Sequence, residues 1–403
     1  MGPVVNDETM NLKQIQSALA LTDSDGWLFY DFHNRDHIGY RVLGLDFKKP
    51  CSRRWFCYVP RTGKPLKLVH AIEPKMLATV PGATTVYRGH VDLHAALREM
   101  LKGARRVAMQ YSPMGNVPTI SLTDAGTVEL IRSYGVEVVS SAELVARTYS
   151  TIDARGFELH QEAGRKVQAI KNDAFKKIFD AIKKGKKLDE YSLQQQIMER
   201  FVTENLTSGL HGPIIAANAH AADPHFEPTK KNSQVFKKND RILLDIWAKV
   251  NVPGAIYYDI TWCGYAGEKP PALYVKRFDI AMQARDAAIQ FASDSLAAGR
   301  TVRGWEVDQA CRNVIAAQGL EPFFRHRTGH SIDASVHGEG ANIDGLETKD
   351  DRSILPNTCF SIEPGIYKAG IGVRTEVSVC VDAKKRVSVF GDIQTALVTP
   401  ETL

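Results

Sequence analysis

Four carboxylates lie inside apolar segments that their composition predicts to be strands. They are Asp245, Asp259, Glu363 and Glu376. The two aspartates belong to RILLDIWAKV (241–250) and AIYYDITWCGYAG (255–267), which the turn sequence NVPG joins into a hairpin. The two glutamates belong to TCFSIEPGIYKAGIGVRTEVSV (358–379), which we expect to form two strands around a glycine-rich turn. An isolated carboxylate in a buried strand is costly, so the fold must protonate these groups, pair them or bring a metal ion to them.

If the four carboxylates converge, their mutual repulsion excludes a fully ionised cluster without cations. Two unit charges about 4 Å apart repel by roughly 4 kcal/mol at an effective dielectric near 20. Arg374 shares the strand face of Glu376 by the period of two, but one guanidinium cannot balance four charges. Divalent ions can, and a ligand set dominated by carboxylates favours Mn²⁺, with Co²⁺ and Zn²⁺ as alternatives. Four acids are also enough to bridge two ions.

Histidines gather in two segments that precede or separate the acidic hairpins. They are His211, His220 and His225 in LHGPIIAANAHAADPHFEPT (210–229), and His326, His330 and His337 in RHRTGHSIDASVHGEG (325–340). A single histidine is more often a satisfied polar residue than a ligand, and the spacing does not select among these six. A single strand carboxylate is likewise more often an edge residue or an ion-pair partner. The prediction of a metal centre therefore depends on the acids and histidines taken together.

The chain has 403 residues, which suits two domains, and its pattern changes near residue 150. Strands are expected at 26–32, 54–60, 66–72, 84–89, 105–111 and 136–141, and helices at 91–103 and 121–135. Their alternation predicts an α/β domain over residues 1–152, in which RTGKP (61–65) is a hairpin turn rather than a phosphate loop. Long helices are expected at about 156–183, 188–206 and 276–298 of a second domain, 153–403.

Composition limits the choice of partners and compartment. The net charge is +5, from 51 basic and 46 acidic residues, and the excess is too small and too dispersed to indicate binding to nucleic acid or a membrane surface. No apolar run approaches membrane-spanning length, and MGPVVNDETM contains no apolar signal core. The six cysteines form no C-x-x-C pair, so we expect reduced thiols and a cytoplasmic protein.

The order of these segments resembles the pita-bread metallopeptidases, the family of methionine aminopeptidase, aminopeptidase P and prolidase. The resemblance covers roughly residues 155–403. The preceding α/β domain resembles the N-terminal domain of the creatinase, aminopeptidase P and prolidase branch, which methionine aminopeptidases lack. The resemblance therefore implies an α/β N-terminal domain followed by an α+β pita-bread catalytic domain of the creatinase/aminopeptidase type.

The resemblance also implies the residues of the site. The metal ligands would be Asp245 in LLDIW, Asp259 in YYDIT, His330 in TGHSI, Glu363 in SIEPGIY and Glu376 in VRTEVSV. The catalytic residues would be Glu363 as proton shuttle, His337 in ASVHGEG at the scissile carbonyl, and His225 in DPHFEPT with Arg374 to orient the substrate. Two divalent ions are implied, with Mn²⁺ preferred over Co²⁺ or Zn²⁺, and Asp259 and Glu376 would bridge them.

The sequence departs from the family pattern at three places. Asp245 and Asp259 are 14 residues apart (259 − 245), longer than usual, and NVPGA lengthens the turn. Trp262 stands where the family often has arginine after D-x-T. HGEG replaces a more usual His-Glu or His-Asp pair, so the role of Glu339 stays open. We expect the first two changes to affect substrate entry or metal preference without removing a ligand.

The implied activity is hydrolysis of the Xaa-Pro peptide bond. Overall likeness to bacterial Xaa-Pro dipeptidases favours dipeptides as substrates, as in prolidase, and aminopeptidase P acting on longer peptides is the alternative. A metal-free creatinase-type hydrolase and a non-catalytic binding module rank lower because all five ligands are present. A homodimer is implied, in which FHNRDHIGY (32–40) would approach the partner's active site; an ordinary surface loop is the other interpretation.

Overall fold

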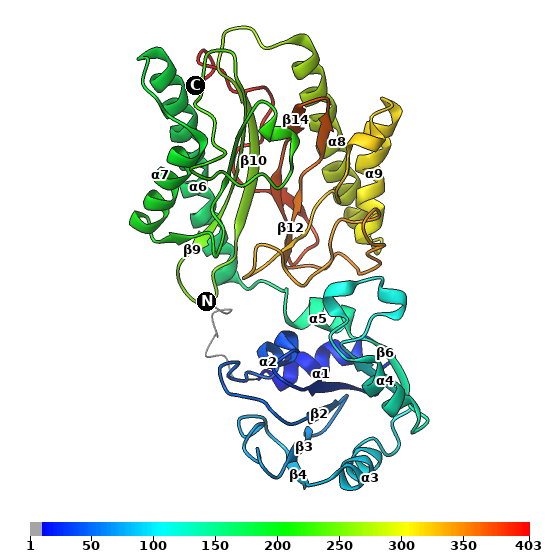
Figure 1. The fold of residues 1–403 in the computed structure, drawn as a ribbon. Coiled ribbons are helices and arrows are strands. Elements are labelled where there is room, and N and C mark those ends of the chain that lie inside the picture. Colours follow the sequence, from blue (N-terminus) through cyan, green and yellow to red (C-terminus); the bar gives the residue numbers. More distant parts are fainter. Residues whose placement is uncertain (1–9) are drawn as a thin grey trace. The chain divides into compact units, whose positions relative to one another are not determined.

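The computed structural model describes residues 10–403. The first nine residues, which include most of the segment predicted to lack a signal core, lie outside the described part. The chain divides into two compact units, Met1–Ser150 and Thr151–Leu403. Figure 1 draws both, coloured from blue at the N-terminus to red at the C-terminus. Within residues 10–403, no helix has both the length and the apolarity needed to cross a membrane.

The first unit is built on a six-stranded mixed sheet of order β4-β3-β2-β1-β5-β6. The strands are β1 (Gly26–Asp31), β2 (Trp55–Pro60), β3 (Leu66–His70), β4 (Ala83–Tyr87), β5 (Arg106–Met109) and β6 (Glu137–Ser140). The helices are α1 (Leu12–Ala20), α2 (His37–Val42), α3 (His90–Met100), α4 (Ala125–Arg132) and α5 (Ala142–Thr148), with 3₁₀ turns η1 (Pro113–Gly115) and η2 (Pro118–Ile120). All predicted strands and both predicted helices are confirmed, and residues 61–65 join β2 to β3 as a hairpin.

Strand β1 shows why this sheet is buried on both faces. Its side chains alternate, so Trp27 and Phe29 enter one apolar cluster while Leu28 and Tyr30 enter the other. The segment 32–40 is only partly a loop, because α2 begins at His37. Asp36 caps that helix by accepting a hydrogen bond from the Gly39 N–H at 2.8 Å.

The second unit contains long helices on both sides of two larger sheets. The helices are α6 (Ala154–Lys183), α7 (Glu190–Thr203), α8 (Ala272–Ala297) and α9 (Gly304–Ala317), with η3 (His220–Ala222) and η4 (Glu321–Phe323). The strands are β7 (Leu206–Thr207), β8 (Ile214–Ala217), β9 (Arg241–Val250), β10 (Tyr258–Tyr265), β11 (Ser331–Ile332), β12 (Thr358–Ile362), β13 (Gly365–Lys368), β14 (Ile371–Arg374), β15 (Val377–Val381) and β16 (Val387–Val389). Helix α6 packs on β9 and β10, and α8 packs on α9, β12 and β14 (Figure 1). This arrangement agrees with the α+β pita-bread domain that the resemblance implied.

The three predicted long helices are confirmed, but α9 was missed. Its buried residues Val307, Cys311 and Ile315 recur every four positions, which is the signal of a helix with one apolar face. Glu306 accepts a hydrogen bond from the Arg303 N–H at 2.8 Å and so fixes the start of the helix.

The segment 358–379 differs from the single hairpin that we predicted. An outer ladder pairs β12 with β15, and an inner ladder pairs β13 with β14. Glu363 and Glu376 occupy the break between the two ladders. Their backbone N–H groups donate to the backbone carbonyls of Thr328 and Thr261, at 2.7 and 3.1 Å respectively. Pro364 follows Glu363 and has no N–H for a continuous ladder. The break therefore places the two glutamates across from each other at one point of the sheet.

The β9–β10 hairpin places its two aspartates on one face. Asp245 is opposite Thr261, and Asp259 is opposite Trp247, so the aspartates are diagonal neighbours. Because β9 ends at Val250 and β10 begins at Tyr258, the connection between them absorbs the long Asp245–Asp259 spacing.

A disulfide joins Cys359 to Cys380, whereas the sequence predicted reduced thiols. The two residues are 21 positions apart in the chain but directly opposite each other in the β12–β15 ladder. No short sequence motif predicts this disulfide, because only the register of the two strands brings the cysteines together. Cys51, Cys57, Cys263 and Cys311 are buried and unbonded to sulfur.

Candidate metal centre

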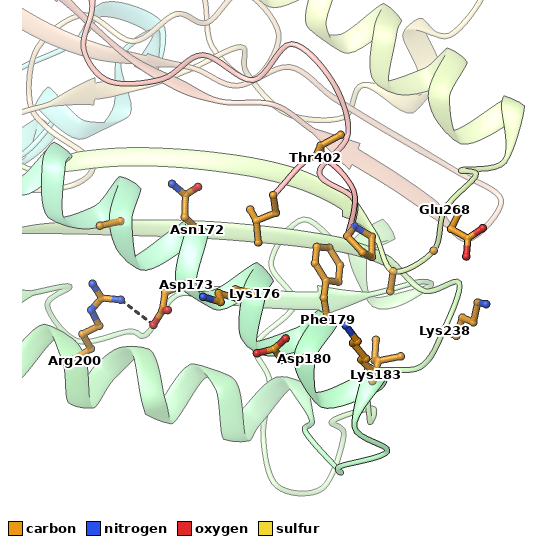
Figure 2. Close-up of a pocket in the computed structure, with 16 residues that line it drawn as sticks. Asn172, Asp173, Lys176, Phe179, Asp180, Lys183, Arg200, Lys238, Glu268 and Thr402 are labelled. Atoms are coloured by element: carbon orange, nitrogen blue, oxygen red, sulfur yellow. Dashed lines mark hydrogen bonds and ion pairs between the residues drawn. The ribbon is translucent and has the colours of Figure 1, made fainter.

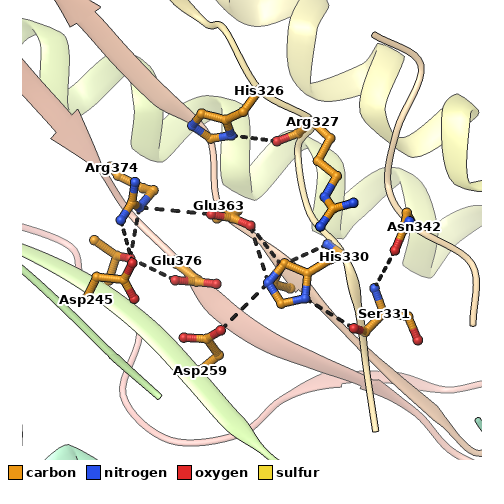
Figure 3. A network of polar contacts seen from close by, with 12 residues as sticks. Asp245, Asp259, His326, Arg327, His330, Ser331, Asn342, Glu363, Arg374 and Glu376 are labelled. Atoms are coloured by element: carbon orange, nitrogen blue, oxygen red, sulfur yellow. Dashed lines mark hydrogen bonds and ion pairs between the residues drawn. The ribbon is translucent and has the colours of Figure 1, made fainter. Parts of the chain in front are cut away.

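The five residues that the resemblance marked as ligands come together at one place in the second unit (Figure 3). They are Asp245 on β9, Asp259 on β10, His330 before β11, Glu363 after β12 and Glu376 before β15. Ligand atoms of Asp259, His330 and Glu376 all lie within 4.8 Å of one another. His330 Nε2 lies 3.5 Å from Glu363 Oε1 and 3.7 Å from Asp259 Oδ2. The site is buried, although the Glu363 side chain remains 16% exposed.

His330 presents a lone pair to these carboxylates. Burial, with the nearby His337 and Arg327, lowers its pKa well below the usual value, so the imidazole is neutral. Its Nδ1 donates to the Ser331 carbonyl at 3.1 Å, which leaves Nε2 as an acceptor. The contacts to Asp259 and Glu363 are too long for hydrogen bonds and would join acceptor to acceptor. A divalent cation held by His330, Asp259 and Glu363 would satisfy all of these atoms.

The four carboxylates also lack enough nearby positive charge to stay ionised, as their raised pKa values indicate. Burial raises the pKa of Asp245, and it raises the pKa of Glu363 to about 7. Burial and repulsion from neighbouring carboxylates raise the pKa values of Asp259 and Glu376 well above the ordinary range. Asp259 Oδ1 is buried without a hydrogen-bond partner. Four carboxylates with one neutral imidazole form a donor set that fits divalent metal ions.

Arg374 is the main cation inside this cluster, and it is fully engaged by the protein. Its Nε donates to Thr261 Oγ1 at 3.1 Å, Nη1 to the Tyr367 hydroxyl at 3.1 Å and the Pro224 carbonyl at 3.3 Å, and Nη2 to Asp245 Oδ2 at 2.5 Å. The residue is 3% exposed. We expected Arg374 to face the substrate, but its burial favours a role in holding Asp245.

Sequence analysis missed two polar residues that hold these groups, Thr261 and Tyr367, and did not single out His326 from the six candidate histidines. Thr261 Oγ1 donates to Glu376 Oε2 at 2.7 Å while it accepts from Arg374. The Tyr367 hydroxyl lies 2.9 Å from His326 Nε2, so it can donate there while it accepts from Arg374. Thr261 could have been found, because it lies two residues after Asp259 and so shares its strand face. Tyr367 carries no comparable signal, and the spacing of the six histidines does not select His326.

Two further histidines lie on the solvent side of the centre. The His337 ring is exposed and stands edge-on to His330, with the ring centroids 4.4 Å apart. His225 is also exposed, and it follows Pro224, whose carbonyl accepts from Arg374. The fold therefore separates exposed imidazoles that a substrate can reach from the buried imidazole of His330.

The other two histidines of the 210–229 segment, His220 and His211, lie beside glutamate side chains outside the cluster of ligand residues. His220 Nδ1 lies 2.9 Å from both carboxylate oxygens of Glu190, which is fully buried at the start of α7. Glu190 also accepts from the N–H groups of Ala217 and Gln234. His211 is largely exposed, 3.8 Å from Glu227. These contacts anchor the segment that carries His225.

Two of the departures from the family pattern can now be located. Trp262 lies on the face of β10 opposite the carboxylates, and Lys171 of α6 lies 3.2 Å from the centre of its ring. We expected Trp262 to affect substrate entry, but its side chain packs against α6 instead. The main chain of Glu339 is held by Asp333 Oδ2, which accepts its N–H at 3.0 Å.

Residues 162–383 match the model of metallopeptidase family M24. The chain belongs to this family. Family membership implies divalent metal ions, and the donor set described above fits them.

Two relatives illustrate the likeness. The probable dipeptidase PepE of Mycobacterium tuberculosis is 27% identical over 290 residues, 72% of this chain and 71% of the relative. The Xaa-Pro dipeptidase of Lactobacillus helveticus is 30% identical over 205 residues, 50% of each chain. This M24 chain spans 66% and 52% of the lengths of two Mycoplasma relatives.

Solved structures share the fold of this M24 protein along most of its length. Dipeptidase PepE from Mycobacterium ulcerans has a TM-score of 0.69 at 20% identity and covers 96% of both chains. The prolidase from Pyrococcus horikoshii has a TM-score of 0.62 at 17% identity, covering 96% of this chain and 99% of that chain. The X-Pro aminopeptidase from Thermotoga maritima has a TM-score of 0.57 at 18% identity, covering 95% and 99%. At such identities the likeness shows the fold alone.

A separate hollow in the M24 unit includes none of the five ligand residues (Figure 2). It lies along α6, beside Arg200 of α7 and the end of the chain at residues 400–403. Arg200 Nη1 donates to Asp173 at 3.0 Å across it, and lysines and acids alternate on its wall. Its mixed charge and open form indicate a solvated surface groove.

Proposed function

We propose that this chain is a proline-specific metallopeptidase that hydrolyses the Xaa-Pro bond of dipeptides. Two divalent ions are part of the proposal, manganese first, with cobalt or zinc as alternatives. They would be held by Asp245, Asp259, His330, Glu363 and Glu376, with Asp259 and Glu376 between the two. The observation that carries the proposal is the buried cluster of four carboxylates facing the lone pair of a neutral imidazole. The names of the PepE and Xaa-Pro dipeptidase relatives support the choice of dipeptides.

Divalent ions at such a site polarise the scissile carbonyl and lower the pKa of a water molecule. Glu363 would move a proton to the leaving nitrogen. Its side chain, 16% exposed, is more exposed than those of Asp245 and Asp259, and burial raises its pKa to about 7. An acid of this strength can hold and release a proton near neutral pH. Ser361 Oγ donates to Glu363 Oε1 at 3.3 Å and keeps that oxygen oriented.

The exposed histidines would bind the substrate. His337 would donate a hydrogen bond to the carbonyl oxygen as negative charge develops on it. His225 would orient the proline end of the peptide from the other exposed position. Arg374 would act indirectly, because it holds Asp245 in place through a hydrogen bond of 2.5 Å. All these residues belong to the proposed catalytic domain, 153–403.

Aminopeptidase P activity on longer peptides is the second candidate, since the Thermotoga maritima X-Pro aminopeptidase shares the fold. Hydrolysis of Ala-Pro and Ala-Pro-Ala, each with Mn²⁺, Co²⁺ or Zn²⁺ added in turn, separates the two activities. We expect Ala-Pro to be cleaved faster. Preference for Ala-Pro-Ala would assign the second activity instead.

The metal centre is tested by removing one ligand charge at a time. We expect Asp259→Asn and Glu376→Gln to lose bound metal and peptide hydrolysis together, because each carboxylate faces the other ligands from a buried position. Metal analysis and hydrolysis of Ala-Pro are the measurements. Asp294→Asn is the matched control, since Asp294 is exposed on α8 of the same unit. A folded Asp259→Asn protein with full activity and no bound metal would falsify the proposal.

The proposal includes a homodimeric, cytoplasmic enzyme in which the 32–40 segment approaches the partner's active site. His33 and Arg35 are the exposed side chains of that segment. Light scattering of the purified chain measures the oligomeric state. We expect Arg35→Ala to raise KM if the segment reaches the partner's site, and an unchanged KM assigns it as an ordinary surface loop.

A further inference from the structure

A second buried cluster lies in the same sheet as the candidate metal centre. Cys359 and Cys380 form the disulfide between β12 and β15, with their Cα atoms 4.3 Å apart. His160 of α6 is fully buried beside them, and its Nε2 lies 3.6 Å from Cys380 Sγ. His160 Nδ1 lies 2.6 Å from the Tyr257 carbonyl, so it donates there and Nε2 is an acceptor. The proposed peptidase chemistry uses none of these three side chains.

The disulfide shares a strand face with the ligand glutamates. Side chains at every second position of β12 and β15 point the same way, so the cysteine pair, the serine pair and the glutamates form one column. These positions are Cys359 with Cys380, Ser361 with Ser378, and then Glu363 and Glu376. The serines contact the centre directly: Ser361 Oγ accepts from the His330 N–H at 3.0 Å, and Ser378 Oγ accepts from the Asp259 N–H at 3.0 Å.

The disulfide also closes a covalent loop around the inner ladder. Residues 359–380 contain β13, β14, Arg374 and both glutamates. In this loop the two ladders are interrupted at Glu363 and Glu376, whose backbone groups bond to other segments. A cross-link at the outer end of β12 and β15 reduces the number of open states available to the loop.

We propose that Cys359 and Cys380 are a reversible thiol–disulfide site whose oxidation restrains local opening of the segment that carries Glu363 and Glu376. The oxidant class is a small peroxide, since Cys359 is 1% exposed and Cys380 7% exposed, which excludes bulky disulfides. The effect on metal retention rests on the metal centre that we propose above. The restraint on local opening is independent of that metal centre.

The oxidation balances as two thiols and one hydrogen peroxide giving one disulfide and two waters. His160 Nε2 takes the proton of the Cys380 thiol, and the sulfur attacks one peroxide oxygen. The O–O bond breaks, and the departing hydroxide takes the proton from His160 to form the first water. Cys380 is then a sulfenic acid. The Cys359 sulfur attacks Cys380 Sγ, the S–O bond breaks, and the hydroxyl leaves with the Cys359 proton as the second water.

The test compares reduced and peroxide-treated full-length protein. Free thiols are alkylated after denaturation, and the peptides are identified by mass spectrometry. We expect Cys359 and Cys380 to be linked after peroxide and free after treatment with a phosphine reductant. In metal-free protein, amide hydrogen exchange over residues 363–376 should be at least threefold slower in the oxidised form. In protein loaded with Mn²⁺, release of the metal to EDTA should slow by a similar factor.

Three variants separate this site from general effects of oxidation. Cys359→Ser/Cys380→Ser repeats the serine pair Ser361 and Ser378, the next pair on the same face of the sheet, and it should exchange and release metal like the reduced protein whether or not peroxide is added. His160→Gln should slow disulfide formation while leaving the exchange of the fully oxidised protein unchanged. Cys51→Ser, which changes a buried cysteine of the first unit, should behave as the unchanged protein.

Three outcomes overturn the proposal. Both thiols could stay alkylatable after peroxide, the exchange of residues 363–376 could be the same in both redox states, or the reduced thiols could hold one Zn²⁺ with His160 and resist peroxide. The comparison of redox states uses the unaltered protein, so it stands even where the double variant does not fold. If the protein binds no Mn²⁺, only the proposed metal centre is rejected. The thiol–disulfide proposal is still tested, because hydrogen exchange is measured on metal-free protein.

Discussion

At the residue scale, the centre is a set of acceptors with too few donors. His330 Nε2, Asp259 Oδ1 and the raised pKa values of the four carboxylates all report the same deficit. Arg374 donates to four acceptors, whereas the Thr261 hydroxyl donates to Glu376 alone and accepts from Arg374. Hydrogen bonds from these donors orient the carboxylates, whereas cations would neutralise them.

Thr261→Val tests this orienting role. Valine keeps the shape of threonine but cannot donate to Glu376 or accept from Arg374 Nε, so both partners lose a fixed position. We expect Mn²⁺ affinity to fall roughly 10–100-fold, in line with other residues that orient metal ligands. Metal titration of the folded variant is the measurement.

Thr358→Val is the matched control for that substitution. Thr358 is also buried in the second unit, but its hydroxyl donates to the Leu355 carbonyl. A similar destabilisation with unchanged metal affinity is expected. If Thr261→Val binds Mn²⁺ as tightly as this control does, the hydroxyl has no part in holding the ligands.

At the element scale, the interrupted hairpin 358–381 decides where the glutamates lie. The sequence predicted one hairpin because its apolar residues continue through Glu363 and Glu376 with little change. Pro364 was the only local sign of the break, and its missing N–H does not reveal that Thr328 and Thr261 would accept from the glutamates. These acceptors come from segments far along the chain, and local pattern cannot identify them.

Gly372→Ala tests the close approach between β14 and η3. A Cβ at this position would lie 1.6 Å from the Ala221 carbonyl oxygen, so the backbones must separate. We expect a loss of about 3 kcal/mol or more in the free energy of unfolding, because the clash is with backbone and not with a flexible side chain. The displaced segment carries His225, so KM should rise as well.

Gly370→Ala provides the comparison in the same turn. A Cβ there meets nothing within 4 Å, and the only penalty is the positive φ of 69°. A loss of roughly 1–2 kcal/mol with unchanged KM is expected. Equal losses in the two variants would mean that the contact with Ala221 is not a constraint. Denaturant unfolding and hydrolysis kinetics measure both effects.

At the scale of the whole molecule, the carboxylate cluster links stability to pH and to metal. The folded-state pKa of Glu363 is about 7, above its unfolded value near 4.5. Between these values the folded protein binds more protons than the unfolded chain, so a rise in pH lowers the free energy of unfolding. Without metal, Glu363 alone therefore destabilises the fold by roughly 3 kcal/mol once the pH exceeds 7.

Comparison of Glu363→Gln with the unaltered chain isolates this effect. Buried histidines such as His160 have lowered pKa values and act in the opposite direction at acid pH, but they are common to both proteins. In EDTA, the stability advantage of the variant should grow from pH 5 to pH 8. With Mn²⁺, the unaltered chain should be the more stable. A difference that stays constant with pH in EDTA contradicts the assignment, and thermal unfolding measures it.

The sequence by itself determined many of the elements and the need for cations at the centre. Residue periodicity predicted the strands of the first unit and the long helices of the second, because each pattern is set by neighbours within a few positions. Buried acids in strand sequences predicted a need for cations, because desolvation penalises carboxylates in any fold. The resemblance then selected the five ligands.

Tertiary structure decided what depends on register and on distant partners. It broke the 358–379 hairpin at the glutamates, joined Cys359 to Cys380, and buried Arg374 against Asp245. It also turned Trp262 toward α6 and left His225 and His337 exposed. Strand pairing brings together residues that the chain keeps far apart, so no local pattern contains these contacts.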